Sequence, residues 1–316
     1  MPSTTDPSRI NLYINEVAPR DGFQNEAKFI DTDDKIALID RLSNCGFAKI
    51  EVTSFTSPRA IPALRDAEAV MHRIRRHPDV LYTVLVPNAR GAERALACQI
   101  DEANLVMSLS KSHNRANLRM GREQSFQQLQ EVVAVLKRTP VLINVSLSTT
   151  FGCPMLGDIA DDEIWRWMDR FAAIGVHGFT LCDTTGMAFP SQVQRICEGA
   201  RTRFGEQQLT LHFHNTRGMA LANTLAAINA GVVRFDAALG GLGGCPYAPG
   251  ASGNVCTEDM IHMLDLMGYR TGIDLTAVLQ AACLLPAMIG HEVPGQVLKA
   301  GRRLDLHPQP EQLQSA

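Results

Sequence analysis

The sequence predicts an α/β protein, a (β/α)8 TIM barrel with a short C-terminal helical appendage. Short β-branched or aliphatic runs alternate with longer amphipathic runs from Asn11 to about Gly268, as in repeated βα units around a parallel sheet. The 316 residues suffice for such a barrel, which takes about 250 residues, and for an extension. No G-x-G-x-x-G follows the first run, which counts against an open dinucleotide-binding sheet.

Eight runs form the predicted barrel wall, each with the length and composition of a strand. They cover residues 12–17, 49–53, 81–86, 102–108, 141–148, 178–182, 209–213 and 234–238. Amphipathic segments between them predict helices over residues 33–45, 123–137, 161–174, 191–203 and 218–230. We expect Asp33 to cap the first of these helices and Pro190-Ser191 to open the fourth.

The chain is expected to form one domain with an appendage. Residues 1–270 would build the catalytic barrel, because the βα alternation fills this range and no low-complexity linker interrupts it. Residues 271–316 contain one more helical pattern and a polar end rich in Gln and Pro. We therefore expect a capping helix followed by a weakly ordered tail.

Composition excludes several classes of partner. With 30 basic and 33 acidic residues the formal net charge is -3, which gives no basic field for nucleic acid. No apolar run reaches the roughly 18 residues of a membrane span, so we expect no membrane partner. The eight cysteines contain no C-x-x-C pair and the N-terminus lacks a signal-peptide core, so a reduced, cytoplasmic protein is expected.

Polar residues cluster just after several predicted strands, where the active site of a barrel lies. Arg20 is either a surface ion-pair residue or a guanidinium that stabilises an enolate or carboxylate oxygen beside Asp21. Asp183 and Glu51 either take part directly or only orient other groups. The candidate residues of this kind are Glu16, Arg20, Asp21, Gln24, Glu51, Ser54, Ser108, Asn117 and Asp183.

The seventh run contains an H-x-H pair, His212 and His214, which is the best metal signal in the sequence. Residues i and i+2 of a strand face the same side, so both imidazoles can bind one cation. Two core histidines satisfied by hydrogen bonds are the alternative. Oxygen ligands from Asp21 and Asn254 would complete a site suited to Mg²⁺ or Mn²⁺, whereas a structural zinc site would use thiolates.

A glycine-dense loop, GLGGCPYAPGASGN over residues 241–254, follows the last predicted strand. Glycine at this density suits a loop that approaches or closes over a ligand, and it places Cys245 where chemistry could use it. An ordinary surface turn with a buried thiol is the other interpretation.

Six segments together resemble the 3-hydroxy-3-methylglutaryl-CoA (HMG-CoA) lyases, a family of metal-dependent TIM-barrel lyases. The resemblance extends from the first strand to the last, and the cysteine loop is specific to the lyase branch. The matching segments are EVAPRDGFQNE, IEVTSFTSP, SLSKSHNRANL, CDTTG, HFHNTRGMALANTL and GLGGCPYAPGASGNVCTEDM.

The resemblance implies a role for each matching position. Asp21, His212, His214 and Asn254 would bind the cation, with His212 also counted among the catalytic residues. Arg20 would face the thioester or enolate oxygen, and Cys245 would transfer a proton. Substrate contacts would come from Arg20, Gln24, Glu16, Ser54, Ser108 and Asn117, while Glu51 and Asp183 would be catalytic or orienting groups.

The chain departs from the family pattern at two places. The family usually reads H-C-H-D-T-Y-G-Q where residues 212–219 contain Arg217 and Met219, and it has a Tyr-Glu pair where this chain has Met155 and Leu156. The implied ligands survive both changes, but the acyl group of the substrate is put in doubt. Arg217 either adds a cation at the mouth or is solvated at a helix start.

The implied reaction is a retro-Claisen cleavage of HMG-CoA to acetyl-CoA and acetoacetate, with an acyl-CoA as substrate. It would serve either leucine breakdown or the catabolism of a branched terpenoid acid. The same chemistry on a longer 3-alkylglutaryl-CoA or on citramalyl-CoA is an alternative. A condensing acyltransferase would need more chain after the barrel, and a silent CoA-binding protein would have lost ligands. The resemblance also implies a homo-oligomer, a dimer or tetramer.

Overall fold

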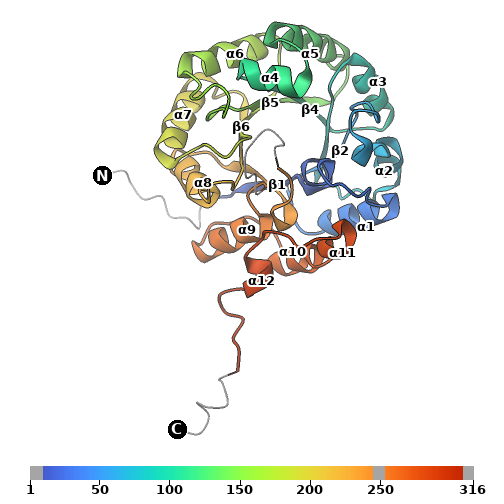
Figure 1. Ribbon diagram of the computed structural model, residues 1–316, viewed down its shortest axis with the longest axis vertical. Coiled ribbons are helices and arrows are strands. Elements are labelled where there is room, and N and C mark those ends of the chain that lie inside the picture. Colours follow the sequence, from blue (N-terminus) through green and yellow to red (C-terminus); the bar gives the residue numbers. More distant parts are fainter. Residues whose placement is uncertain (1–9, 245–252, 309–316) are drawn as a thin grey trace.

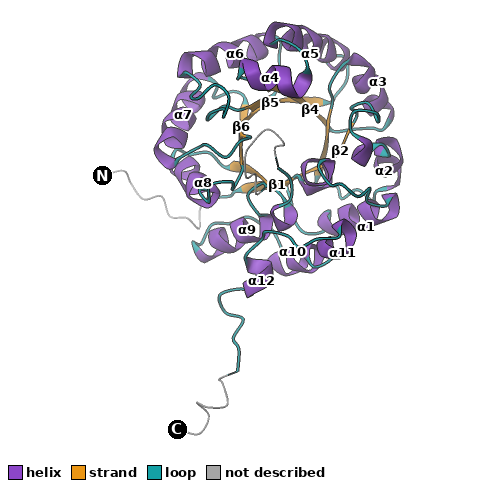
Figure 2. Ribbon diagram, in the orientation of Figure 1, coloured by secondary structure: helices purple, strands orange, loops and turns teal. Residues whose placement is uncertain are grey.

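The protein is a closed barrel of eight parallel strands, seen end-on within a ring of helices (Figure 1; Figure 2). The structure is a computed structural model that describes residues 10–244 and 253–308. Neighbouring strands pair in sequence order, and the last strand pairs with the first, Tyr13 opposite Arg234 and Glu16 opposite Ala237. The predicted (β/α)8 barrel is confirmed.

Each predicted strand is present, and its ends differ by no more than one residue from the prediction. The alternation of β-branched runs with polar turns therefore predicts the strands of the barrel correctly. The strands are β1 Tyr13–Glu16, β2 Lys49–Ser54, β3 Leu81–Leu85, β4 Glu102–Ser108, β5 Leu142–Ser148, β6 Gly178–Asp183, β7 Gln208–Phe213 and β8 Arg234–Ala237.

The helices form the outer ring and its C-terminal continuation. Short non-α turns also occur, namely η2 (Ala18–Gly22), η3 (Pro62–Leu64) and η4 (Leu239–Gly241). The α-helices are α1 Thr32–Leu42, α2 Ala67–Arg73, α3 Ala89–Ala97, α4 Lys111–Leu118, α5 Arg122–Leu136, α6 Asp161–Ala173, α7 Pro190–Arg203, α8 Ala220–Asn229, α9 Thr257–Leu266, α10 Leu275–Ala282, α11 Leu285–Ile289 and α12 Val297–Ala300. None of these described helices has the length and apolar character needed to cross a bilayer.

The first helix begins earlier than expected. The side chain of Asp31 accepts a hydrogen bond from the amide of Asp33 at 2.8 Å, so Asp31 caps α1 and Asp33 lies in its first turn. Asp33 as the cap is therefore a wrong prediction, because the carboxylate of Asp31, two residues earlier, already accepts from the first-turn amide. Pro190 occupies the first position of α7, as predicted.

The residues after the barrel form three short helices, α10 to α12, instead of one capping helix. Val278, Leu285 and Ile289 are buried in the same apolar core as the barrel residues. These helices lie beside α9 and α1 in Figure 1. The boundary at residue 270 stays a prediction, and the last part of the tail lies outside the described residues.

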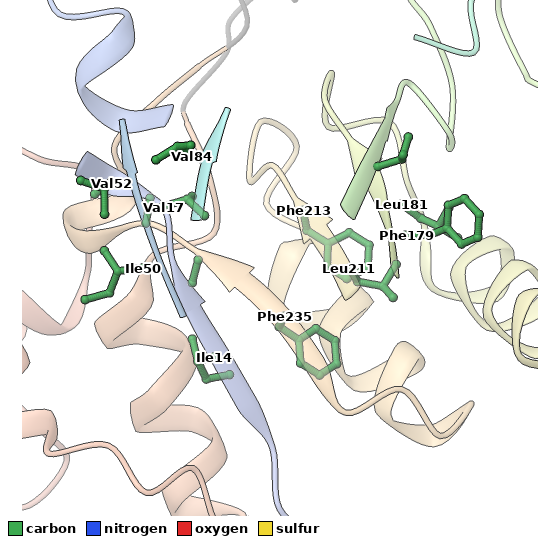
Figure 3. Close-up of a cluster of buried hydrophobic side chains, with 14 of the residues drawn as sticks. Ile14, Val17, Ile50, Val52, Val84, Phe179, Leu181, Leu211, Phe213 and Phe235 are labelled. Carbon is green, nitrogen blue, oxygen red and sulfur yellow. The ribbon is translucent and has the colours of Figure 1, made fainter. Parts of the chain in front are cut away.

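The main apolar core lies between the barrel wall and the helices. Figure 3 shows alternate strand residues such as Ile14, Ile50, Phe179, Leu211 and Phe235 gathered in this layer. Because strand side chains alternate between faces, the residues between them face the barrel interior. That inner face is mostly polar. The part of it beneath the barrel mouth is lined by Asn15, Val17, Lys49, Glu51, Thr83, Glu102, Asn104, Asn144, Thr180 and Asp236.

Candidate functional site

A π-helical turn directly after β1 brings Arg20 and Asp21 to the mouth of the barrel. In this turn, η2, the carbonyl of Val17 accepts hydrogen bonds from the amides of Arg20, Asp21 and Gly22. Wide turns of this kind are rare and occur often at functional sites. The sequence offered no signal for the turn, although Pro19 in its first residues suits a helical start.

Three predicted metal ligands come together. Asp21, His212 and His214 each offer an atom within 4.8 Å of the others, and all are buried or half-buried. His212 lies in β7 and His214 directly follows it, bridged to Asn254, so the alternation of side chains puts both on the inner face. The arrangement corresponds to the predicted cation site.

Asn254 is placed against the same carboxylate. Its amide nitrogen donates to Asp21 Oδ2 at 2.8 Å and to the carbonyl of Leu242 at 2.9 Å. Its Oδ1 is buried and has no hydrogen-bond partner among the described residues. A buried acceptor left free beside two imidazoles and a carboxylate fits the coordination of a divalent cation, which favours such oxygen donors.

Two glycines allow this close approach. A Cβ on Gly253 would lie 2.1 Å from the carbonyl oxygen of Gly241, and a Cβ on Gly243 would lie 2.6 Å from Asn254 Nδ2. Both have positive φ, +101° for Gly253 and +91° for Gly243. Glycine is therefore required at these two positions, because any side chain there would collide with the backbone or with Asn254.

The surroundings of Asp21 and His214 favour the protonation states in which these side chains can bind a cation. Burial opposes ionisation of Asp21, yet Arg20 and the two histidines hold its pKa well below the usual range. Burial, with His212 nearby, lowers the pKa of His214 to about 3, so this imidazole is neutral at neutral pH. Burial acts to lower the pKa of His212, but its bond to Asp236 and the charge of Asp21 raise it. A cation would compete with that proton.

Asp236 on β8 is a site residue that the sequence analysis missed. Its Oδ2 lies 3.2 Å from His212 Nδ1, and its Oδ1 accepts a 2.8 Å hydrogen bond from Asn15 Nδ2. A carboxylate in this position directs Nε2 of His212 toward Asp21, from which it is 3.9 Å away. The signal that could have found it is the expected second partner of a metal-binding histidine on the adjacent strand.

Arg20 is held between two carboxylates. Its Nη1 lies 2.5 Å from Asp21 Oδ1 and its Nη2 lies 2.6 Å from Glu51 Oε2. Burial acts to lower the pKa of Arg20, but the two carboxylates raise it above its ordinary value, so the cation is permanent. Glu51 itself lines the barrel interior below the site, which makes it a group that positions Arg20.

Two connected cavities lead to the candidate ligands Asp21, His212, His214 and Asn254, called here the metal-ligand group. An inner cavity of about 140 Å³ includes Arg20, Asp21 and both histidines in its wall. An outer groove of about 740 Å³ runs along η3, α4 and the start of α5. The two share Gln24, Asn25, Leu85, Val106 and Asn117. Of the predicted substrate residues, Arg20, Gln24 and Asn117 therefore line the path.

Glu16 and Asp183 do not line either cavity. Glu16 shares the outward parity of Ile14, and its carboxylate accepts hydrogen bonds from the amides of Ala18 and Leu239 and from the Thr257 hydroxyl. Asp183 Oδ1 accepts from the amides of Met187 and Ala188. Both carboxyl groups are buried, and burial raises the pKa of Glu16 to about 8 and that of Asp183 to about 7. Their roles in the reaction stay predictions.

Ser54 and Ser108 are likewise one step removed from the cavities. Ser54 Oγ donates to the Thr56 hydroxyl at 2.8 Å, and Thr56 lines the outer groove. Ser108 Oγ lies 2.6 Å from Nδ1 of His113, which lines the inner cavity. Neither serine lines one of these two cavities, and each is bonded to a residue that does, so the direct substrate contacts of both serines stay predictions.

The departures from the family pattern lie away from the inner cavity. Arg217 Nη1 donates to the carbonyls of Thr185 and Gly186, at 3.1 and 2.8 Å, so it fastens the loop after β6. Met155 and Leu156 are about half exposed at 47% and 51%, and Met219 precedes α8. Cys245, the predicted proton donor, lies outside the described residues.

Comparison with known proteins decides the family. The HMGL-like family profile matches residues 11–285. The chain belongs to the HMGL-like family. The resemblance identified from the sequence motifs is thereby confirmed.

Members of the HMGL-like family with named activities match along nearly their full length. The hydroxymethylglutaryl-CoA lyase YngG of Bacillus subtilis is 43% identical, over 91% of this chain and 96% of its own. The (R)-citramalyl-CoA lyase of Chloroflexus aurantiacus is 37% identical, over 92% and 95%. A solved HMG-CoA lyase of A. baumannii, in complex with coenzyme A and 3-methylmalate, is 50% identical, with a TM-score of 0.92 and coverage of 97% and 100%.

Proposed function

We propose that this protein is a divalent-metal-dependent carbon-carbon lyase that cleaves HMG-CoA to acetyl-CoA and acetoacetate. One observation carries the proposal: Asp21 and the paired imidazoles offer ligand atoms close enough to share one cation, with the free Oδ1 of Asn254 and the permanently charged Arg20 on residues that bond Asp21. Relatives named HMG-CoA lyases that match over nine-tenths of the chain support it.

The residues divide the work. Asp21, His212, His214 and Asn254 would hold Mg²⁺ or Mn²⁺, which when bound supplies a Lewis acid that favours loss of the substrate hydroxyl proton. Arg20, kept rigid by its two carboxylate contacts, would donate hydrogen bonds to the thioester oxygen as negative charge builds there.

The proton balance assigns a further role. When the C2–C3 bond breaks, the C3 oxygen becomes a ketone and the electron pair forms the enolate of acetyl-CoA. C2 of that enolate must then take a proton, and we assign its delivery to the thiol of Cys245. The proton released from the C3 hydroxyl then restores the thiol, so that one proton leaves oxygen and one enters C2. Asp183 would act indirectly, because its carboxylate closes the loop that carries Thr184 into the cavity wall.

The outer groove would hold the coenzyme A part of the substrate. Its volume of about 740 Å³ lies in the range of binding sites for ligands of that size. Arg59 and Arg119 lie along it and could contact phosphate groups, while Asn117 and Gln24 lie at its junction with the inner cavity. The A. baumannii relative was solved with coenzyme A bound.

The test is direct. Purified protein with Mg²⁺ or Mn²⁺ is incubated with HMG-CoA, and acetyl-CoA and acetoacetate are quantified. Release of both products in equal amounts, abolished by His214→Ala, is the expected result. A folded, metal-loaded protein that leaves HMG-CoA intact contradicts the substrate assignment.

A second substrate is supported by one comparison. The Chloroflexus relative is named (R)-citramalyl-CoA lyase and covers as much of the chain as the HMG-CoA lyases do. Citramalyl-CoA and a longer 3-alkylglutaryl-CoA therefore belong in the same assay. The cytoplasmic location, the homo-oligomeric state and a place in leucine breakdown stay predictions from the sequence.

A further inference from the structure

The barrel interior beneath the site contains a continuous chain of hydrogen bonds that ends at Arg20. At its centre is Asn104 on β4, which is 7% exposed. Asn104 Nδ2 donates to Glu51 Oε1 at 2.9 Å, and Glu51 Oε2 contacts Arg20 Nη2 at 2.6 Å. Asn104 is thus one residue away from the guanidinium, on the opposite side of Glu51.

The side-chain oxygen of Asn104 also accepts two hydrogen bonds. Its Oδ1 accepts hydrogen bonds from Asn144 Nδ2 at 3.0 Å and from Ser146 Oγ at 2.8 Å, both on β5. Ser146 lines the inner cavity, as Arg20 does. The amide therefore links β2, β4 and β5 and cannot turn over without losing three hydrogen bonds.

This arrangement is unusual for a barrel interior, which bulky aliphatic side chains normally fill in layers. A buried carboxylate with only one partner would be free to rotate about its side-chain torsions and to let Arg20 move. With Asn104 on one oxygen and Arg20 on the other, each oxygen of Glu51 is fixed. A displacement of about 1 Å at a catalytic group can cost on the order of a hundredfold in rate.

We propose that Asn104 is a positioning residue for the reaction: acting through Glu51, it fixes the direction in which Arg20 faces the substrate. The inference rests on the proposed function, in which Arg20 touches the thioester oxygen. It adds a residue that neither contacts the cavity nor belongs to the metal-ligand group, and that the sequence motifs do not include.

The experiment replaces Asn104 by a side chain of similar shape without hydrogen-bonding groups. Asn104→Leu is expected to lower kcat for HMG-CoA by roughly ten- to a hundredfold. KM and the Mn²⁺ affinity should change little, because the groove and the metal ligands keep their contacts. Thr180→Val is the matched control, since Thr180 accepts a hydrogen bond from Asn144 and makes none to Glu51 or Arg20 among the described residues, and the kcat of this variant should stay at the wild-type value.

A double-mutant cycle separates positioning from a general loss of packing. If Asn104 acts only through Glu51, then adding Asn104→Leu to Glu51→Gln should lower kcat little further than Glu51→Gln alone. Fully additive losses, an unchanged kcat in Asn104→Leu, or a loss equalled by Thr180→Val would overturn the proposal.

Two further measurements cover the remaining outcomes. If Asn104→Leu does not fold, Asn104→Ser, which keeps a hydroxyl donor in a smaller side chain, is measured in its place and should lose less kcat. A crystal structure of the variant reads out the position of Arg20 without turnover. Arg20 still bonded to Glu51 in its original direction contradicts the inference even if the wild type cleaves no HMG-CoA, a result that by itself would count only against the proposed function.

Discussion

Asp236 illustrates how a residue outside the metal-ligand group can set the affinity of that group. It faces Nδ1 of His212, so the imidazole can present only Nε2 to a cation. We predict that Asp236→Asn weakens Mn²⁺ binding by roughly ten- to a hundredfold, because the amide holds the ring less firmly and favours the wrong tautomer. Isothermal titration with Mn²⁺ measures it, with Thr180→Val as the control. Equal affinities would remove Asp236 from the site.

For Cys245 we predict a loss of turnover without a loss of metal affinity. Cys245→Ser should bind Mn²⁺ as the wild type does and lose most of its turnover, since a hydroxyl is a far weaker acid than a thiol. Steady-state kinetics and metal titration on the same sample provide both readouts. Turnover at the wild-type level would take the cysteine out of the mechanism.

At the scale of single residues, the sequence predicted the groups that carry recognisable chemistry. The H-x-H pair is readable because strand alternation puts both rings on one face, and Asp21 and Asn254 follow from the family motifs. Asp236 and Asn104 are not readable in this way, since each acts through a partner on another strand whose register must be known. The roles of Glu16 and Asp183 stay predictions, and the sequence motifs alone do not show that their parity within β1 and β6 directs both side chains outward.

The loop after β8 makes a prediction at the scale of an element. Gly253→Ala should displace Asn254, because the new methyl group would collide with the carbonyl of Gly241, and should weaken Mn²⁺ binding and lower Tm. Gly268→Ala is the control: Gly268 also has positive φ, +83°, but has open space around it. The control should cost about 1 kcal/mol in the free energy of unfolding and leave metal affinity intact. Equal metal affinities in both variants would contradict this account.

Glu16 joins β1 to η4 and α9 and makes the stability of that junction depend on pH. Burial raises the pKa of Glu16 to about 8, from 4.5. A carboxyl with a raised pKa keeps its proton in the folded state, so its contribution to the free energy of unfolding falls as pH rises from about 4.5 to 8. Glu16→Gln cannot ionise and should flatten this decline. Urea unfolding of both proteins at pH 5 and pH 8 measures it, and identical slopes would refute it.

The strands were more predictable than the turns and the C-terminal helices. The eight strands follow from periodicity, whereas the π-helical turn at Ala18–Gly22 depends on three amides sharing one carbonyl, which no local pattern specifies. The C-terminal segment was expected to contain one helix and contains three, because Pro286 and the left-handed Gly290 interrupt the apolar pattern.

For the whole molecule, metal binding should be coupled to stability, since the candidate ligands come from the turn η2 after β1, from the end of β7 and the residue after it, and from the loop after β8. At a Mn²⁺ concentration one hundred times its Kd, the free energy of unfolding should rise by about 2.7 kcal/mol. Thermal unfolding with excess Mn²⁺ or with EDTA measures the difference in Tm. His214→Ala should show none, and a wild-type Tm that ignores Mn²⁺ would speak against a shared site.

The pairing of β8 with β1 has a consequence for biosynthesis. Arg20 and Asp21 leave the ribosome early, the paired histidines nearly two hundred residues later, and Asn254 after the last strand. Translation must therefore pass residue 254 before all four candidate metal ligands are present. A polypeptide that ends within α8 contains Arg20, Asp21 and both histidines but lacks β8, which pairs with β1 and closes the barrel. We therefore expect such truncated products to be inactive.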